Sequence, residues 1–438
     1  MYIWLRGVRG MRRVTSTILR EDSMIGAGAT PDDSAVVGER PGFLGTCSLM
    51  ASLILMLVGL FSMAIVLPQI ALDFPNEPHA ALFSQLIGSS AGFAFAITSP
   101  FVGRFIERFG YRRIYIFSLI VFAVAGTAPA FLHSLSAILT TRIVLGSSVA
   151  TAFTACATGI SRLPPDQHAR MLGRQALVGG CAGLVIFPVV GLLADHGWRL
   201  PFGIHLIALL ILPMALTLPE DPAGPVGHTT AEPAARATGL SIAVILVTIF
   251  VGMASFVAAM YAPFYLNSIG ITQPSLISLT PTMSVIGSIV ASAVYGTLRR
   301  RFDSSQMFKG TLWLIAIGLL IGGCSSTMPL FIVGIFFYGL GQSTFVPNIV
   351  AFAIDRAKGN PALGIGILMG MLNGGPILGP FVTGLISHLG GPASVFLSFG
   401  AIALLLAIFY DPGENAQPWW RRLLRSPVAP QADAAYKS

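Results

Sequence analysis

Charged side chains are scarce in this chain of 438 residues. Asp, Glu, Lys and Arg together make up 10% of it and hydrophobic residues 54%, with a mean hydropathy of +0.78. Soluble domains carry about 25% charged residues. So few charges cannot cover the surface of a chain this long with groups that water solvates, which excludes a soluble protein. Most of the surface must therefore face lipid.

Cysteine and catalytic motifs are scarce as well. The four cysteines lie far apart in apolar stretches and form no CxxC or Cys/His cluster, which predicts packing roles for Cys47, Cys156, Cys181 and Cys324. There is no HExxH motif, no pair of carboxylates in an apolar stretch and no GxxxxGKS or GxxxxGKT phosphate loop. We therefore predict no metal or cofactor, no membrane-embedded enzyme and no primary pump built from this chain alone.

The chain instead has twelve apolar stretches, bounded by charges or by Gly, Pro or Asn. A helix needs roughly 20 apolar residues to cross a bilayer. Because every backbone polar group in lipid needs a partner within the protein, these stretches are predicted to be helices. We expect an all-α membrane protein with twelve transmembrane helices, at about 45–72, 80–102, 112–132, 136–160, 172–194, 200–218, 240–266, 275–298, 310–326, 329–353, 362–387 and 392–410.

Positive charge is unevenly distributed between the predicted loops. With the N-terminus in the cytoplasm, every Lys and Arg lies on the cytoplasmic side except Arg142, inside the fourth span, and Arg199, on the outside. This bias accounts for the net charge of +8 without a nucleic-acid partner. The basic first 41 residues lack the apolar core of a signal peptide. The excess of Arg over Lys suggests a GC-rich bacterium, so we expect a multi-pass protein of the bacterial inner membrane with both termini cytoplasmic.

A polar segment rich in Pro, Gly and Ala divides the spans six and six. We predict a basic cytoplasmic tail at 1–41, six-helix bundles at 42–218 and 240–411, a cytoplasmic linker at 219–239 and a second tail at 412–438. Similar residues recur between the halves at offsets of 192 to 195, in the pairs Gly103 and Gly296, Pro188 and Pro380, and Pro68 and Pro263. These offsets indicate a duplicated transporter whose halves rock around a central cavity.

The predicted loop between spans 2 and 3 reads GRFIERFGYRR. It resembles the signature of the major facilitator superfamily, whose fold is two bundles of six transmembrane helices. The matching residues would form a latch that holds the halves together in one conformation and releases them in the other: Gly103, Glu107, Arg108, Gly110, Arg112 and Arg113. Glu107 replaces the usual Asp, and Tyr111 stands where a base is usual. The alternative is that these arginines serve only to orient the chain.

Other spans carry weaker resemblances to the same family. Arg142 and Gly146 match its R-x-x-x-G pattern in span 4, and a buried cation is a candidate functional site; the alternative is a side chain that reaches back to the interface. Span 5 resembles the Gly/Pro-rich helix of exporters, with Phe187 where Gly is typical. The resemblance implies that spans 1, 4, 7 and 10 line the cavity, through Ser62, Met63, Arg142, Tyr261, Tyr265, Tyr338, Gln342 and Asn348. Interhelical hydrogen bonding is the alternative for these residues, and His205 is predicted to be a packing residue.

No acidic residue lies in the middle of a predicted span. Proton-coupled relatives often use a carboxylate inside span 1 or span 4, so coupling here would need another group, such as Asp73 at the rim or the substrate itself. The unpaired Arg142 favours an anion, a zwitterion or a neutral compound with acceptor groups over a strong cation.

We therefore expect a monomeric secondary active transporter that exports small organic molecules, similar to the drug and metabolite efflux branch. Its partners would be a small-molecule substrate, the lipid bilayer and, as candidate coupling ion of an antiporter, protons. The first alternative is an uptake symporter for an organic anion or metabolite. The second is a transporter-like membrane sensor.

Overall fold

The computed structural model describes residues 42–77, 79–163, 165–220, 242–302, 304–356 and 361–410. The predicted tails at 1–41 and 412–438 and most of the predicted linker at 219–239 lie outside these residues. All regular structure in the described ranges is helical. The spans therefore come directly from the apolar stretches, as expected for backbone that must satisfy its own hydrogen bonds in lipid.

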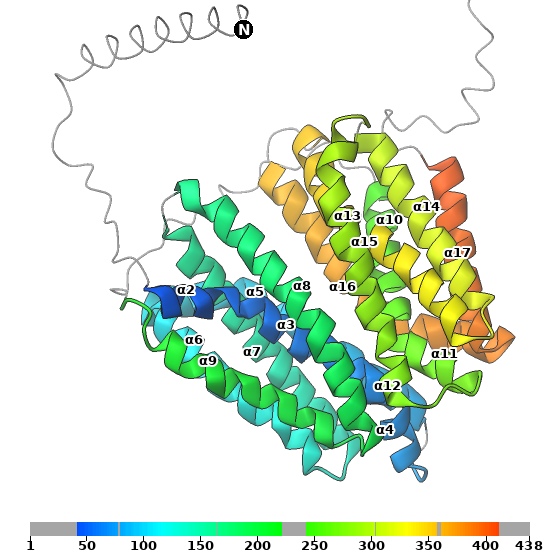
Figure 1. Ribbon diagram of the computed structural model, residues 1–438, viewed down its shortest axis with the longest axis horizontal. Coiled ribbons are helices and arrows are strands. Elements are labelled where there is room, and N and C mark those ends of the chain that lie inside the picture. Colours follow the sequence, from blue (N-terminus) through cyan, green and yellow to red (C-terminus); the bar gives the residue numbers. More distant parts are fainter. Residues whose placement is uncertain are drawn as a thin grey trace, which may run out of the picture. The chain divides into compact units, whose positions relative to one another are not determined.

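The first half contains six helical spans. Span 1 consists of α2 (Phe43–Met50), α3 (Ser52–Phe61), the 3₁₀ segment η1 (Ser62–Val66) and α4 (Leu67–Asp73). The others are α5 (Ala80–Phe109), α6 (Tyr111–Thr127) with η2 (Ala128–Ala130), α7 (Leu135–Ser161), α8 (Pro165–Asp195), and η3 (Leu200–Leu206) with α9 (Ile207–Ala215). Within this half, α5 and α6 pack against α7, and α6 packs against α9 (Figure 1).

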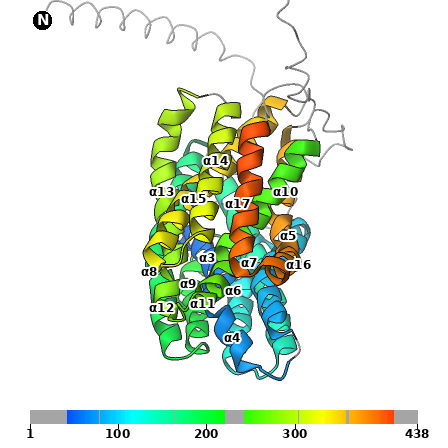
Figure 2. The same ribbon diagram turned by 90° about the vertical axis from the view of Figure 1, so that its right-hand side faces the viewer.

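The second half also contains six helical spans. Span 7 consists of α10 (Ile242–Phe256), the π-helical segment η4 (Val257–Tyr261) and α11 (Ala262–Ser268), and span 8 of α12 (Pro274–Ile277) and α13 (Leu279–Arg299). Spans 9 to 12 are α14 (Ser304–Gly323), α15 (Met328–Arg356), α16 (Pro361–Gly390) and α17 (Pro392–Phe409). Here α14 packs against α15 and α17, α13 against α15, and α10 against α16 (Figure 2).

The predicted all-α membrane fold is confirmed. In the described part of the chain, eleven helices are long and apolar enough to cross a membrane, and the shorter apolar helix Leu200–Ala215 lies at the place of the predicted sixth span. The helix boundaries agree with the apolar stretches to within a few residues, apart from extensions such as that of α5 to Phe109. Hydropathy finds these spans because each one satisfies its length and composition requirement locally.

Both halves have the same break in their first span. The 3₁₀ segment η1 and the π-helical segment η4 begin 195 residues apart, and Pro68 and Pro263 follow them at the same offset. A proline has no N–H to donate, and its ring clashes with the carbonyl four residues earlier. That carbonyl falls inside η1 in one half and inside η4 in the other, so each proline accounts for its break. The two broken segments are in contact with each other.

The halves touch at one end, which we call the Trp198 end because α4 and α8 finish there, beside Trp198. There α8 packs against α12 and α13, α4 against α11, and α5 against α16. A Cβ atom on Gly191 of α8 would lie 2.5 Å from the Ser278 Cβ and 2.9 Å from the Pro274 carbonyl oxygen, so only glycine allows this approach. The Thr383 hydroxyl of α16 also donates to Gln85 Oε1 of α5 across 3.1 Å.

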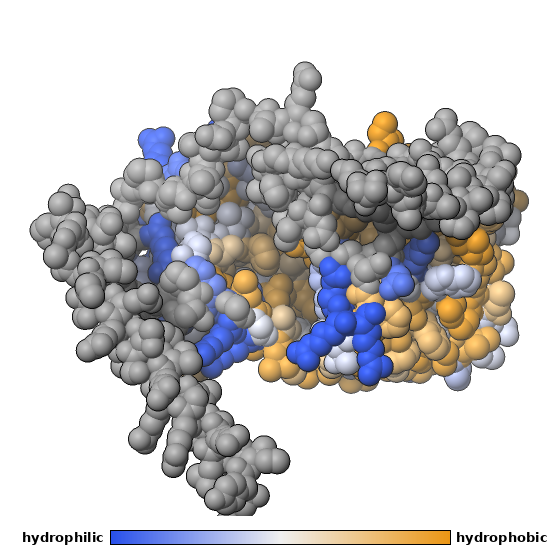
Figure 3. Space-filling model, turned by 90° about the horizontal axis from the view of Figure 1, so that it is seen from above, coloured by the Kyte–Doolittle hydropathy of each residue, from blue (hydrophilic) through white to orange (hydrophobic). Residues whose placement is uncertain are grey.

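The same helix faces are open toward the other end, which we call the Gly110 end because α5 finishes and α6 begins there. On α8, Gly183 and Gly180 still face Val285 and Ile289, but a Cβ on Gly173, two turns further along that face, would meet nothing within 4 Å. Gly296 of α13, two turns beyond Ile289, is equally open. In the view onto this end, two groups of hydrophilic side chains flank deeper hydrophobic residues (Figure 3). The halves therefore separate toward the Gly110 end.

Candidate functional site

Arg142 is buried inside the first half. Its side chain is only 1% exposed, and its Nη2 donates to the carbonyl oxygen of Gly59 in α3 at 3.4 Å. Its Nε and Nη1 have no hydrogen-bond partner among the described residues. In a 3₁₀ helix each N–H bonds the carbonyl three residues back instead of four. The change from α to 3₁₀ at Ser62 can thus leave a nearby carbonyl such as that of Gly59 for the guanidinium.

Gly146, one turn after Arg142, sets how closely α7 approaches α5. A Cβ at this position would overlap the backbone of Ala91, including its carbonyl oxygen. The R-x-x-x-G pattern therefore combines a buried cation with a close helix contact on one face of α7. The guanidinium lies against α3 rather than at an end of the span. Whether Arg142 also contacts substrate stays a prediction.

His205 of η3 is fully buried in the same half of the chain as Arg142. Its Nδ1 lies 2.9 Å from the carbonyl oxygen of Phe202, and since a carbonyl only accepts, Nδ1 carries the hydrogen. The other ring nitrogen, Nε2, then has a lone pair, and it has no partner within the described ranges. The ring lies 5.4 Å from that of Phe122, and a Cβ on Gly126 would overlap it. The predicted packing role accounts for one ring nitrogen and leaves the other unexplained.

Within the described ranges, the predicted latch residues at the turn between α5 and α6 form no hydrogen bond or ion pair with the second half. Gly110 has φ +79°, a backbone conformation that favours glycine and makes the sharp turn. Arg108 lies over the ring of its neighbour Phe109, and the carboxylate of Glu107 has no ion pair with any described residue. A Cβ on Gly103 would meet nothing within 4 Å, so this conformation does not require that glycine. A latch formed in another conformation stays a prediction.

Arg112 instead holds the end of span 6. Its Nη2 donates to the carbonyl oxygen of Leu216 at 2.6 Å, and its Nη1 lies 3.0 Å from Glu220 Oε1. A cation satisfies the free carbonyls at a helix C-terminus in this way. Arg112 therefore ties the turn between α5 and α6 to the start of the segment that leads to the second half.

Tyr111, the departure from the family signature, has a clear partner. It is 4% exposed, and the guanidinium of Arg162 at the end of α7 lies 5.3 Å from its ring centroid. Partial burial lowers the pKa of Arg162, although a guanidinium remains protonated at neutral pH. A base at position 111 would face this cation, whereas an aromatic ring attracts it.

The residues predicted to line the cavity in the second half divide into two groups. Asn348 accepts from the Tyr295 hydroxyl at 2.9 Å and donates to Thr311 Oγ1 at 3.0 Å, and the Tyr265 hydroxyl donates to the Ser325 carbonyl at 2.6 Å. These are the interhelical bonds of the alternative interpretation. By contrast, the Tyr338 hydroxyl and Gln342 Oε1, one turn apart on α15, are buried without a partner in the described chain. Tyr261 lies in the η4 break, and its ring packs 6.2 Å from that of Phe396.

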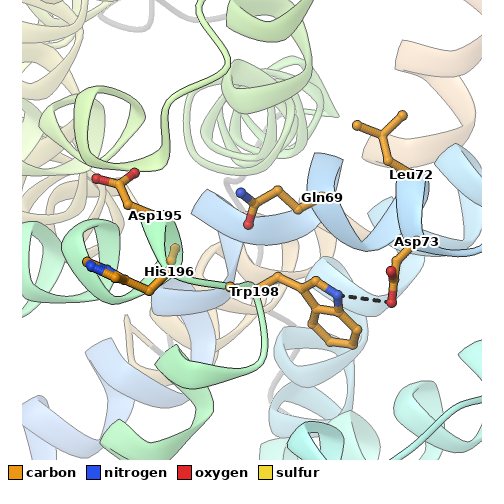
Figure 4. A pocket seen from close by; sticks show the side chains of 8 residues that line it. Gln69, Leu72, Asp73, Asp195, His196 and Trp198 are labelled. Atoms are coloured by element: carbon orange, nitrogen blue, oxygen red, sulfur yellow. Dashed lines mark hydrogen bonds between the residues drawn. The ribbon is translucent and has the colours of Figure 1, made fainter.

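The Trp198 end has a polar cluster that the sequence motifs did not predict. Asp73 Oδ2 accepts from Trp198 Nε1 at 3.1 Å (Figure 4). It also accepts from Arg199 at 3.2 Å, and the guanidinium of Arg199 lies 4.2 Å from the centroid of the indole ring. Across the halves, Asp195 Oδ1 accepts from the backbone N–H of Ser275 at 3.0 Å. A shallow depression lies over this cluster and is lined by Gln69, Leu72, Asp73, Ala194, Asp195, His196, Gly197 and Trp198. The sequence feature that could have indicated this cluster is an acidic residue at the end of a span, opposite the start of another helix.

Two helical halves with a matching break, in contact at one end and apart at the other, are an arrangement typical of membrane transporters. The fold is also that of a solved D-xylose–proton symporter, with a TM-score of 0.68 and 16% identity over 84% of this chain and 98% of that one. The family model of the Major Facilitator Superfamily matches residues 47–272 and 244–435. The chain belongs to this superfamily and is a transporter, not an enzyme.

Two relatives with described roles differ from each other in function. Multidrug resistance protein 2 of Bacillus subtilis is 25% identical over 73% of this chain and 85% of its own length. A gentisate transporter of Corynebacterium glutamicum is 24% identical over 74% of this chain and 77% of its own length. The chain is therefore a multi-pass membrane transporter similar to members that handle different kinds of compound.

Proposed function

We propose that this protein exports small organic molecules by alternating access, working as a monomer with its Gly110 end in the cytoplasm. The Gly/Pro-rich fifth span and the similarity to a multidrug resistance protein support export. The distribution of Lys and Arg supports the orientation. Each chain holds both halves of one pathway, which supports a monomer.

One observation carries this proposal. The faces of α8 and α13 are in tight contact at Gly191 and Ser278 and open at Gly173 and Gly296. A second conformation that closes the open face and opens the closed one would carry a substrate across. With the proposed orientation, the present conformation faces the cytoplasm.

The electrostatics of the first half suggest the substrate class. The guanidinium of Arg142 is buried and has no carboxylate partner in the described part of the chain, and α3, α6 and α7 contain no acidic residue. A buried charge without a partner is costly. An anion or an acceptor-rich compound that reached Arg142 would lower that cost, and a cation would raise it. We therefore infer that organic anions are preferred substrates.

Uptake of an organic anion is the second candidate. It shares the fold and the role of Arg142, and the similarity to a gentisate transporter favours it, because gentisate is a carboxylate. The two candidates differ in direction and in how the proton gradient drives them. They therefore predict opposite changes in the amount of substrate that cells retain.

The test is retention of labelled compounds by an efflux-deficient bacterium that expresses the protein. Anionic, neutral and cationic compounds would each be measured with and without a protonophore. Lower retention that the protonophore abolishes supports export, and higher retention supports uptake. Unchanged retention of every compound would contradict both candidates.

The matched variants are Arg142→Met, which removes the charge at similar length, and Arg142→Lys, which keeps it. We expect Arg142→Met to lose transport of anions specifically and Arg142→Lys to keep part of it. Equal transport of anions by Arg142→Met and the unchanged protein would contradict the role of Arg142.

A further inference from the structure

Two buried side chains in one cluster of the first half have nitrogen atoms that lack a hydrogen-bond partner among the described residues. Arg142 and His205 are the members, with exposed fractions of 1% and 0%. Arg142 Nε and Nη1 and His205 Nε2 lack a hydrogen-bond partner among the described residues. Buried polar groups in folded proteins almost always have partners. Two exceptions in one cluster indicate a place that accepts something the protein itself does not supply.

The cluster is continuous in space. Arg142 donates to the Gly59 carbonyl, and a Cβ on Gly59 would lie 3.0 Å from the ring of Phe122. Phe122 in turn packs against the His205 imidazole at a centroid distance of 5.4 Å. Gly59 and Phe122 thus connect the guanidinium of Arg142 to the imidazole of His205.

The helices around His205 offer no acid that could compensate a second positive charge. The segment η3 that carries His205 packs against α3, α6, η2, α8 and α9. Neither α3, α6 nor α7 contains an acidic residue, and α8 has acids only at Asp166 and at Asp195, which is engaged by Ser275. Apart from Arg142 on α7, the charged and titratable basic groups on these elements lie near the Gly110 end: Arg112, Arg113, His168, Arg170 and Arg174.

We propose that His205 holds the proton that is transported together with an organic anion bound at Arg142. The proposal rests on the uptake candidate and specifies its coupling. The proton adds to the lone pair of Nε2, while Nδ1–H keeps its bond to the Phe202 carbonyl. It enters from water at one end and returns to water at the other, so no covalent bond other than this N–H forms or breaks.

The coupling follows from Coulomb repulsion in a medium of low dielectric constant. An imidazolium and a guanidinium in one buried cluster repel each other when water is excluded. An anion at Arg142 cancels that repulsion, so the anion and the proton stabilise each other's binding. Reciprocal coupling of this kind is required by linkage. The missing carboxylate of the spans is thereby replaced by a histidine whose charge depends on the substrate.

The test measures proton binding by the purified full chain. The probes are benzoate, 2,5-dihydroxybenzoate and succinate, and a pH indicator in weakly buffered detergent solution reports protons taken up between pH 5 and 8. We expect the binding of an anion to be accompanied by the uptake of about one proton per chain. This is the value that linkage gives for one coupled group. His205→Asn should still bind the anion and take up no proton, since its side-chain N–H can replace Nδ1–H toward Phe202.

His196→Asn is the matched control. His196 has the same kind of contact, with Nδ1 3.1 Å from the Leu192 carbonyl, but is exposed at the Trp198 end. This variant should take up the proton like the unchanged chain. In proteoliposomes, His205→Asn should exchange labelled anion within about twofold of the unchanged rate and lose accumulation driven by a pH gradient. A role in packing alone would reduce both.

Each other outcome counts against the proposal. Binding without proton uptake, or equal uptake by His205→Asn, would overturn it. If no probe anion binds, the anion site fails and this inference with it, whereas transport of neutral or cationic compounds would leave the transporter proposal standing. If His205→Asn does not fold, His205→Gln in the same titration decides, since it also cannot carry the proton.

Discussion

Replacing Gly191 by Ala should open the Trp198 end. The added Cβ would lie 2.5 Å from both Cβ and Oγ of Ser278 and 2.9 Å from the Pro274 carbonyl oxygen. The carbonyl belongs to the backbone and cannot rotate away, so α8 must move from α12 and α13. Overpacking of this kind costs about 1 to 3 kcal/mol. A cost confined to the present conformation shifts the balance toward the other one by about 5- to 140-fold.

The assay is a pair of spin-label distance measurements on the purified protein. Labels at Glu77 and Thr272, both exposed near the Trp198 end, should move apart, and labels at Arg104 and Arg301, near the Gly110 end, should approach. The matched control is Gly173→Ala, on the same helix and face but with nothing within 4 Å of the new Cβ. Unchanged distances in Gly191→Ala, or an equal shift in Gly173→Ala, would refute the reasoning.

Three further predictions concern the ends of the bundle. Tyr111→Arg should lower the thermal midpoint by a few degrees, because the new cation faces Arg162, while Tyr111→Phe keeps the ring and should change it by less than about 1 °C. Arg112→Ala should destabilise the chain by about 1 to 2 kcal/mol in denaturant titrations, since it frees a helix-terminal carbonyl. Asp73→Asn should lower the thermal midpoint by no more than about 2 °C, because Trp198 can still donate to the amide oxygen and an exposed pair with Arg199 contributes little; a larger loss would show that the ion pair holds this end together.

The glycines along the facing helices differ in whether the present conformation requires them. Gly191 is required where the halves touch, because any side chain would collide there. Gly173, Gly296 and Gly103 are not required by any contact in the present conformation. A close approach of these residues in the alternate conformation would give them the function that Gly191 has here. Whether the residues at the Gly110 end form a latch in that conformation stays a prediction.

The fold could be predicted almost completely from the sequence. A run of apolar residues is a local property, and in lipid it permits one backbone structure, so the span limits follow from composition alone. The duplication was also readable, since Pro68 and Pro263 impose the same break on both halves. The family signature at Gly103–Arg113 added the superfamily because its glycine and charge spacing is specific.

The partners of the polar residues were decided only by tertiary structure. Arg112 pairs with Glu220 and Asp195 with Ser275, over separations in sequence that no periodicity encodes. Among the residues that the structure describes, Asn348 has hydrogen-bond partners, whereas the hydroxyl of Tyr338 in the same helix has none. Such outcomes depend on how each helix is rotated about its axis and on which end of the two halves is closed. Hydropathy and charge are sums along the chain, whereas the environment of Arg142 and His205 arises from four spans brought together. That arrangement makes a histidine that the sequence predicts to be a packing residue a candidate proton carrier.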